Sequence, residues 1–207
     1  MRLPRNWVTA SSGHSSTPFS AGVTAKPTLR TPRLILGEFT LRDAPDIQRL
    51  AGAREIADTT LAIPHPYELD HALAWIEQQQ RETIGGPSLS FAVRLSPTGT
   101  LIGSVGLRDI DREHRQAELG FWIGRDWWGQ GYAREAAGAV VQFGFETLEL
   151  NRICAHHLAR NPASGRVLLA LGMQREGVLR QRVRKWGKYE DVVLYAILRA
   201  DSDRGTR

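Results

Sequence analysis

Apolar residues recur with two different periods along this chain, and the change of period separates expected strands from expected helices. Short apolar runs and alternation predict strands at residues 33–36, 89–95, 101–108, 116–123, 152–158, 173–180 and 189–198. Helical spacing predicts helices that open near residue 43, continue around residues 69–76, and cover residues 132–147 and 164–171. Strands followed by a strand–helix–strand crossover favour an α/β (α+β) fold with a mixed sheet and helices on its faces.

The ends of these elements carry the usual local signals. Asp43 followed by Pro45 resembles an N-cap with a proline in the first helical turn. The run Ser96-Pro97-Thr98-Gly99 is a turn sequence between two strands. Residues 129–131, Gly-Gln-Gly, stand between the strand at 116–123 and a helix rich in alanine. Because apolar residues occupy more than one face of that helix, we expect it to be largely buried.

The chain has 207 residues, which fits one compact domain with a tail. The first 37 residues contain no acidic residue, and residues 11–20 are rich in Ser, Thr, Pro and Gly. We therefore expect a flexible tail over residues 1–27 and a single domain over residues 28–207. A transit peptide is the second interpretation of the tail. No apolar run approaches the length of a membrane span, so we expect a cytoplasmic protein with no membrane partner.

The formal net charge is +5, with 27 Lys and Arg residues against 22 Asp and Glu. Only Lys26, Lys185 and Lys188 are lysines, and the arginines are scattered along the chain rather than clustered. This charge favours acidic ligands, but we do not expect nucleic acid as a partner. The single cysteine, Cys154, excludes an internal disulfide and any site built from several thiolates. Adjacent His156 and His157 point to opposite faces of a strand, so we expect packing or surface roles and no metal site.

The turn at Gly129-Gln130-Gly131 is the most informative local feature, because a strand leads through it into a helix. Free backbone N–H groups and the positive end of the helix converge there, which predicts an anion site. A tight turn without a ligand remains the alternative. Gln130 stands where a Walker A loop needs Lys, and Arg134 stands where a dinucleotide fingerprint needs its third glycine. Both of those phosphate motifs are therefore excluded.

In combination, four segments resemble the GCN5-related N-acetyltransferase (GNAT) superfamily, and within it the ribosomal-protein N-terminal acetyltransferase branch. The segments are Thr31-Pro32-Arg33-Leu34-Ile35-Leu36, residues 117–123 (AELGFWI), residues 128–136 (WGQGYAREA), and Asn161-Pro162-Ala163-Ser164 with Leu171-Gly172-Met173. The resemblance covers about residues 31–198. It implies a mostly antiparallel sheet of six to seven strands, splayed where the coenzyme binds, and acetyl-CoA as the cosubstrate.

The resemblance also implies which residues hold the coenzyme. Pyrophosphate would lie on the turn, and the pantetheine arm would lie along the preceding strand and near Asn161. The strand contacts fall on Phe121, Trp122 and Ile123, and the turn contacts fall on Gly129, Gln130, Gly131, Tyr132 and Ala133. The superfamily places Gln or Arg where this chain has Asp126, so Arg125 or Arg134 is expected to supply the positive charge.

The catalytic residues implied by the same resemblance are Glu118 and Ser164. Glu118 would act as base, directly or through water; the alternative is an exposed strand carboxylate paired with Arg108 or Arg115. Ser164 would protonate the leaving thiolate; the alternative is a helix cap shared with Asn161, and both roles are compatible. No Tyr occurs at residues 165–171, where many superfamily members carry this acid, so Ser164 is preferred.

We therefore expect acetyl transfer to a primary amine by direct attack. An α-amine has a pKa of about 8 and Lys about 10.4, so freeing a Lys amine costs about 3 kcal/mol more at neutral pH. A single carboxylate therefore suits a protein N-terminus. The alternatives are a small amine such as an antibiotic or polyamine, and a non-catalytic basic module bound to RNA or the ribosome, for which Arg180, Arg182 and Arg184 would be candidates. A monomer and a homodimer are equally compatible with the sequence.

Overall fold

The computed structural model describes residues 26–82 and 85–204. Its strands are β1 (Leu29–Arg30), β2 (Leu34–Gly37), β3 (Leu89–Leu95), β4 (Leu101–Asp111), β5 (Gln116–Ile123), β6 (Arg152–Leu158), β7 (Gln174–Lys185) and β8 (Lys188–Leu198). Its helices are α1 (Ala44–Ala51), α2 (Arg54–Thr59), α3 (Leu69–Gln80), α4 (Tyr132–Glu146), α5 (Pro162–Ala170) and α6 (Arg199–Arg204). Two 3₁₀ turns cover Leu41–Asp43 and Arg125–Trp127.

All the strands join one sheet in the order β1-β2-β3-β4-β5-β6-β8-β7. Only β5 and β6 pair in parallel; the other pairs are antiparallel, which confirms the expected mixed sheet flanked by helices. Within the described residues the sheet has eight strands, one more than the largest expected number. The extra strand, β1, is two residues long, which is too short to show an alternation of apolar and polar residues. It is defined by its pairing with β2.

Some boundaries differ from the expected ones for physical reasons. The strand expected at residues 173–180 ends at Arg180, but β7 continues to Lys185. Its pairing with β8 shifts register on the way, and Gln181 has a positive φ of 50°. The polar run Arg180–Arg184 hides this extension from an apolar pattern. Asp43 does precede α1, but its carboxylate does not cap the helix. It accepts hydrogen bonds from the Thr40 N–H and from Arg94 Nη2, each at 2.7 Å, and so ties the loop before α1 to β3.

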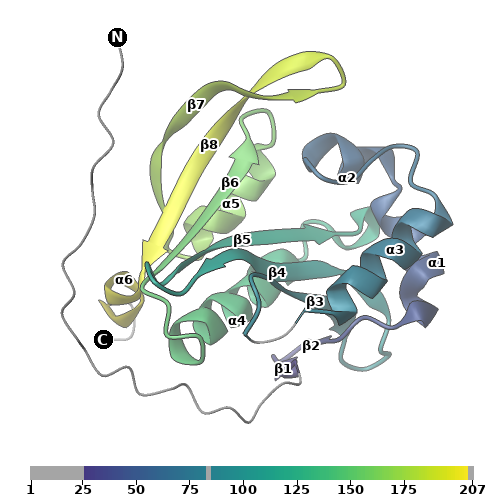
Figure 1. Ribbon diagram of the computed structural model, residues 1–207, viewed down its shortest axis with the longest axis horizontal. Coiled ribbons are helices and arrows are strands. Elements are labelled where there is room, and N and C mark those ends of the chain that lie inside the picture. Colours follow the sequence, from purple (N-terminus) through teal and green to yellow (C-terminus); the bar gives the residue numbers. More distant parts are fainter. Residues whose placement is uncertain (1–25, 83–84, 205–207) are drawn as a thin grey trace, which may run out of the picture.

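Two hydrophobic clusters lie on opposite faces of the sheet. One joins α4 to the strands, with Phe143 of α4 in edge contact with Phe91 of β3. The other joins α1 and α3 to the opposite face through residues such as Phe39 and Ile76. Figure 1 shows α4 below the sheet and α1 to α3 grouped at the right of the view. Within residues 26–82 and 85–204, no helix is long and apolar enough to cross a membrane.

The start of the domain is fixed by a buried lysine. Of the expected tail, residues 1–27, the first 25 residues lie outside the described part of the chain. The Lys26 side chain is 3 % exposed, and its ammonium donates to the Gln79 and Ser90 carbonyl oxygens at 3.1 and 2.9 Å. It also lies 3.4 Å from the Glu82 carboxylate, whose side chain is 8 % exposed. A charge so deeply buried requires these partners.

The parallel pairing of β5 and β6 is short. It joins Gln116 with Arg152 and continues only to Glu118 with Cys154, although both strands run on for several residues. Over the same length β5 stays paired with β4, and β6 stays paired with β8. The strands therefore diverge after Glu118, as Figure 1 shows, and the sheet opens between them.

Two glycines that face each other in the β4–β5 ladder provide a test of this packing. A Cβ at Gly106 would lie 2.8 Å from Ser90 Cα and against the Leu89 carbonyl oxygen, which are backbone atoms that cannot move away. A Cβ at its partner Gly120 meets nothing within 4 Å. We expect Gly106→Ala to lower the free energy of unfolding by about 1–3 kcal/mol. Gly120→Ala is the matched control and should leave it unchanged or raise it slightly. Urea denaturation measures both, and equal stabilities would contradict this packing.

Candidate active site

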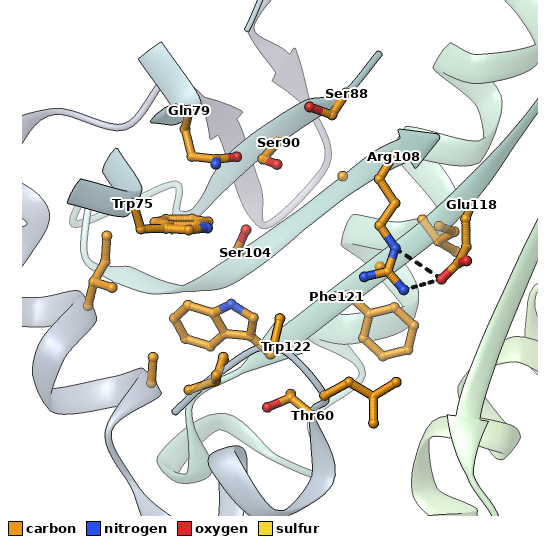
Figure 2. A pocket seen from close by; sticks show the side chains of 18 of the residues that line it. Thr60, Trp75, Gln79, Ser88, Ser90, Ser104, Arg108, Glu118, Phe121 and Trp122 are labelled. Atoms are coloured by element: carbon orange, nitrogen blue, oxygen red, sulfur yellow. Dashed lines mark hydrogen bonds and ion pairs between the residues drawn. The ribbon is translucent and has the colours of Figure 1, made fainter. Parts of the chain in front are cut away.

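A cavity of about 710 Å³ opens on the sheet face beside the gap between β5 and β6. Its walls come from β4 and β5, the α2–α3 segment, and the facing ends of β6 and α5. Figure 2 shows Trp75 and Trp122 at one end, and Arg108 with Glu118 at the other. The size suits a small ligand or the end of a chain.

Glu118 is the last residue of β5 that pairs with β6, and its side chain is 19 % exposed. Its Oε1 accepts hydrogen bonds from Arg108 Nε at 3.0 Å and from Arg108 Nη2 (Figure 2). His156 Nδ1 lies 2.9 Å from the same oxygen. Burial alone raises the pKa of Glu118, but the hydrogen bonds from His156 and Arg108 outweigh it and hold this pKa below its ordinary value. The carboxylate is therefore ionised and already engaged; the Arg108 partner weighed from the sequence is present, and His156 was missed.

Burial alternates from Arg152 to His157 along β6, with His156 half-buried and His157 buried, as the alternation predicts. Both histidines contribute to the cavity lining. His157 is buried, stacks 5.5 Å from the Tyr195 ring, and lies 2.7 Å from the Leu158 carbonyl oxygen through Nδ1. The Cys154 thiol donates to the Ala117 carbonyl oxygen at 3.5 Å. Burial raises the pKa of this thiol and the charge of Glu118 raises it further, so it stays protonated and is no nucleophile.

Ser164 lines the cavity from the first turn of α5. Asn161 is the N-cap of that helix, and its Oδ1 accepts the Ser164 N–H at 3.4 Å. The Asn161 Nδ2 donates to Ser164 Oγ at 2.9 Å. The expected cap is therefore present. Because Oγ accepts this bond, its own hydrogen is left to donate to a group in the cavity.

The glycine turn has the geometry of an anion site. Gly129 and Gly131 have positive φ of 73° and 82°, the region that favours glycine. The first N–H to bond within α4 is that of Glu135, which donates to the Gly131 carbonyl at 3.1 Å. The N–H groups of residues 131–134 therefore stand at the helix start with no acceptor inside the helix, and a Cβ at Gly129 would meet nothing within 4 Å. An anion can approach this backbone closely.

Sequence reasoning missed the clamp that holds this turn. Glu135 of α4 accepts the Thr31 hydroxyl at 2.6 Å and the Arg33 backbone N–H at 2.9 Å, and its other oxygen accepts Arg33 Nε at 2.6 Å. Arg33 Nη1 also donates to the Gln130 carbonyl at 3.0 Å, and its guanidinium lies 4.5 Å from the Tyr132 ring centre. The Thr31-Pro32-Arg33 segment was noted only as part of the family resemblance. Its function here is to fix the turn from the first strands of the sheet.

The two arginines expected to supply charge lie differently. Arg125 forms an ion pair with Glu55 of α2 at 2.6 Å, so its guanidinium is directed toward α2. Arg134 is exposed in the first turn of α4, beside the glycine turn. Asp126 is exposed, and its carbonyl oxygen accepts Gln130 Nε2 at 3.1 Å.

The open edge of β5 presents backbone groups to the gap. The Gly124 N–H bonds to the Ile102 carbonyl of β4 at 2.8 Å, and residues along a strand alternate in direction. The backbone groups of Phe121 and Ile123 therefore point away from β4 toward the gap, and those of Trp122 point toward β4. The Ile123 carbonyl oxygen already accepts a hydrogen bond from Trp128 Nε1 at 2.6 Å. Trp122 instead contributes its side chain to the cavity.

These features fit the pyrophosphate and extended arm of acetyl-CoA: a turn of free amides at a helix start and a strand edge that runs from it to Glu118. The residues near Glu118 do not resemble a metal centre. Within the part of the chain that the structure describes, no three His, Cys, Asp or Glu side chains gather to hold a metal ion.

Comparisons with known proteins agree with this geometry. The model of the Acetyltransferase (GNAT) domain matches residues 33–174. The uncharacterized N-acetyltransferase YoaA of Bacillus subtilis is 33% identical over 178 residues, which is 84% of this chain and 97% of that protein. The Escherichia coli [ribosomal protein uS5]-alanine N-acetyltransferase is 34% identical over 83 residues, 40% of this chain and 43% of that enzyme.

Among solved structures, spermidine N-acetyltransferase from Vibrio cholerae, in complex with CoA and spermine, superposes with a TM-score of 0.72 at 26% identity. The match covers 83% of this chain and 98% of that one. The family match spans more than half of the present chain and includes β5, the glycine turn and α4. The chain therefore belongs to the GNAT family and is an N-acetyltransferase.

Proposed function

We propose that this protein transfers an acetyl group from acetyl-CoA to the α-amine of a protein or peptide N-terminus. The observation that carries the proposal is that β5 connects three features: it precedes the glycine turn, it borders the gap with β6, and it carries Glu118 in the wall of the cavity that Ser164 also lines. The turn and the gap suit the coenzyme, and the cavity suits the acceptor. The two therefore meet beside Glu118.

Different residues bind the pyrophosphate, bind the arm of the coenzyme, and position neighbouring groups. Gly129, Gln130, Gly131, Tyr132 and Ala133 hold the pyrophosphate through backbone N–H groups, with Arg134 as the nearest exposed positive charge. Phe121 and Ile123 pair with the arm of the coenzyme along the open strand edge. Arg125 steadies the turn through Glu55, and Asn161 positions Ser164.

When bound, acetyl-CoA supplies a thioester whose carbonyl carbon is attacked by a neutral amine. Glu118 stands at the reacting end as the carboxylate that favours loss of the amine's proton, directly or through an intervening group. Ser164 donates its hydroxyl hydrogen to the leaving sulfur. The cavity wall of Trp122 and Trp75 receives the rest of the acceptor.

The charges of the cavity support a singly charged acceptor over a polyamine. Among the described residues that line it, the carboxylates are Glu82 and Glu118. Glu82 is paired with buried Lys26, and Glu118 is paired with Arg108. A polycation would find no unpaired carboxylate there, whereas a peptide N-terminus needs to place only one amine beside Glu118. The likeness to the uS5-alanine enzyme supports the same class, and the likeness to spermidine N-acetyltransferase keeps a small amine as the second candidate.

An acceptor panel tests the proposal. Purified protein and acetyl-CoA are incubated with free peptides that begin with Ala, Ser or Thr, with the same peptides N-terminally blocked but carrying Lys, and with spermidine and an aminoglycoside; released thiol is measured. We expect saturable turnover of the free peptides and none of the blocked ones. Turnover restricted to spermidine or the aminoglycoside would move the function to small amines. Binding of RNA without any turnover would favour a non-catalytic module.

The coenzyme site is tested by a methyl group at Gly131. Its φ of 82° makes alanine strained there, and the added Cβ would lie 3.4 Å from Nη2 of Arg33, the side chain that holds the turn. Gly99, at φ 71° with open space around it in the β3–β4 turn, is the matched control. Both alanine variants should lose about 1–2 kcal/mol of stability. Only Gly131→Ala should raise the Kd for CoA, roughly tenfold, which corresponds to about 1.4 kcal/mol. Equal Kd values by calorimetry would place the coenzyme elsewhere.

The hydroxyl of Ser164 is tested by Ser164→Ala. This variant keeps the backbone N–H that Asn161 caps, so the thermal stability should change little. We expect kcat to fall about 10²-fold, with the Kd for CoA unchanged, because only proton donation to the sulfur is removed. Unchanged kcat in steady-state assays with the best acceptor would remove Ser164 from the mechanism.

A further inference from the structure

A histidine that we expected from the sequence to have a packing or surface role lies beside Glu118 in the wall of the cavity. The His156 side chain lines the cavity, is 19 % exposed, and places Nδ1 2.9 Å from Glu118 Oε1. Within the described part of the chain, Glu118 is the hydrogen-bonding partner of this ring, so Nε2 carries no hydrogen bond. With Nδ1–H donated to a carboxylate, Nε2 keeps its lone pair.

Glu118 is a poor proton acceptor in its present contacts. Its Oε1 is shared by Arg108 and His156, and Arg108 contributes a full positive charge. A carboxylate stabilised in this way holds its charge and binds a proton weakly. The His156 imidazole has a free nitrogen, and a carboxylate behind it stabilises the imidazolium that forms when the nitrogen takes a proton.

We propose that His156 Nε2 is the general base that accepts the proton of the acceptor amine, and that Glu118 is the positioning residue that holds the Nδ1–H form of the ring. The proposal rests on the acetyl transfer proposed above and assigns its proton transfer to a different atom. His156 is then a catalytic residue in the sense that it touches the reacting nitrogen.

The step balances without any further reactant. The lone pair of a neutral amine forms the bond to the acetyl carbon, and the carbon–sulfur bond breaks with its electron pair on sulfur. The nitrogen loses one proton to His156 Nε2, and the sulfur gains one proton by way of Ser164. The proton on His156 replaces the one that Ser164 gives, through the cavity solvent, so the products are an amide and a thiol.

The surroundings of His156 are compatible with this role. Glu118 faces it from β5, and Arg108 of β4 reaches it only through the shared carboxylate oxygen. Cys154, two residues before it on β6, stays a neutral thiol, and the residue paired with His156 on β8 is apolar Leu194. From α5 the cavity receives Ser164, which carries no charge.

A second histidine–carboxylate pair of the chain lies outside the cavity and can serve as a control. His114 Nδ1 lies 2.9 Å from the Asp111 carboxylate, the same separation as in the His156 pair, but its side chain is 67 % exposed at the β4–β5 turn. Since His114 lines no part of the cavity, His114→Asn controls for the loss of a carboxylate-bound imidazole as such.

The first test reads the ring itself, with no coenzyme or acceptor present. Long-range proton–nitrogen NMR spectra of the free protein, with the His156 signals identified by their loss in His156→Asn, report which ring nitrogen carries the hydrogen. We expect the Nδ1–H form in the wild type and a mixture with the Nε2–H form in Glu118→Ala, with thermal melting confirming that the variant is folded. If the wild-type ring carries its hydrogen on Nε2, or if Glu118→Ala leaves the ring unchanged, the proposal is overturned.

The second test is kinetic. Asn at position 156 preserves a donor toward Glu118 at the place of Nδ1 but has no basic nitrogen at the place of Nε2. We expect His156→Asn to lower kcat about 10²–10⁴-fold with an unchanged Kd for CoA, and His114→Asn to match the wild type. Full activity of His156→Asn with an acceptor that the wild type acetylates would overturn this inference alone. Absence of any acceptor for the wild type would instead overturn the proposed function, while the NMR result would still decide the arrangement of the ring.

Discussion

The parallel pairing of β5 and β6 stops after Glu118 and Cys154, and the rest of the site depends on this limit. Each strand remains bound to its other neighbour, β4 or β8, so the divergence is built into the sheet. It exposes the backbone of Phe121 and Ile123, and it places Glu118 and His156 where the two strands separate. A sheet paired to the ends of both strands would have neither the open edge nor the cavity beside it.

The polar groups around this opening are held by pairs whose partners come from distant parts of the chain. Glu135 fixes the glycine turn through Thr31 and Arg33, which precede it by about one hundred residues. Lys26 similarly neutralises Glu82 at the far side of the cavity. Buried charges need such partners, and their pairing determines which groups remain available to a ligand. Among the described residues of this site, the helix-start amides, the Ser164 hydroxyl and His156 Nε2 belong to the groups left available, and buried His157 Nε2 also has no partner.

Much of this arrangement was predictable from the sequence, and what was not has a physical cause. The bounds of β5 and β6 follow directly from their apolar pattern, and the glycines and the following helix predict an anion site at Gly129–Gly131, whose positive φ values the structure shows. Pairing across the sheet was not predictable in the same way. Arg108 was one of two arginines weighed as the partner of Glu118, and the contact with His156 requires the register of β5 on β6, which no local pattern specifies. Asp43 carries a cap signal but bonds Arg94 instead, because a buried carboxylate gains more from a guanidinium than from a helix start.

We expect the coenzyme to enter along the opening between β5 and β6, with its phosphates on the turn before α4. A crystal structure of the protein with CoA bound tests this most directly. We expect pyrophosphate oxygens within hydrogen-bonding distance of the N–H groups of residues 129–133, and the sulfur in the gap within reach of Ser164 Oγ. A coenzyme bound elsewhere, or a gap closed by side chains while the coenzyme is bound, would contradict it.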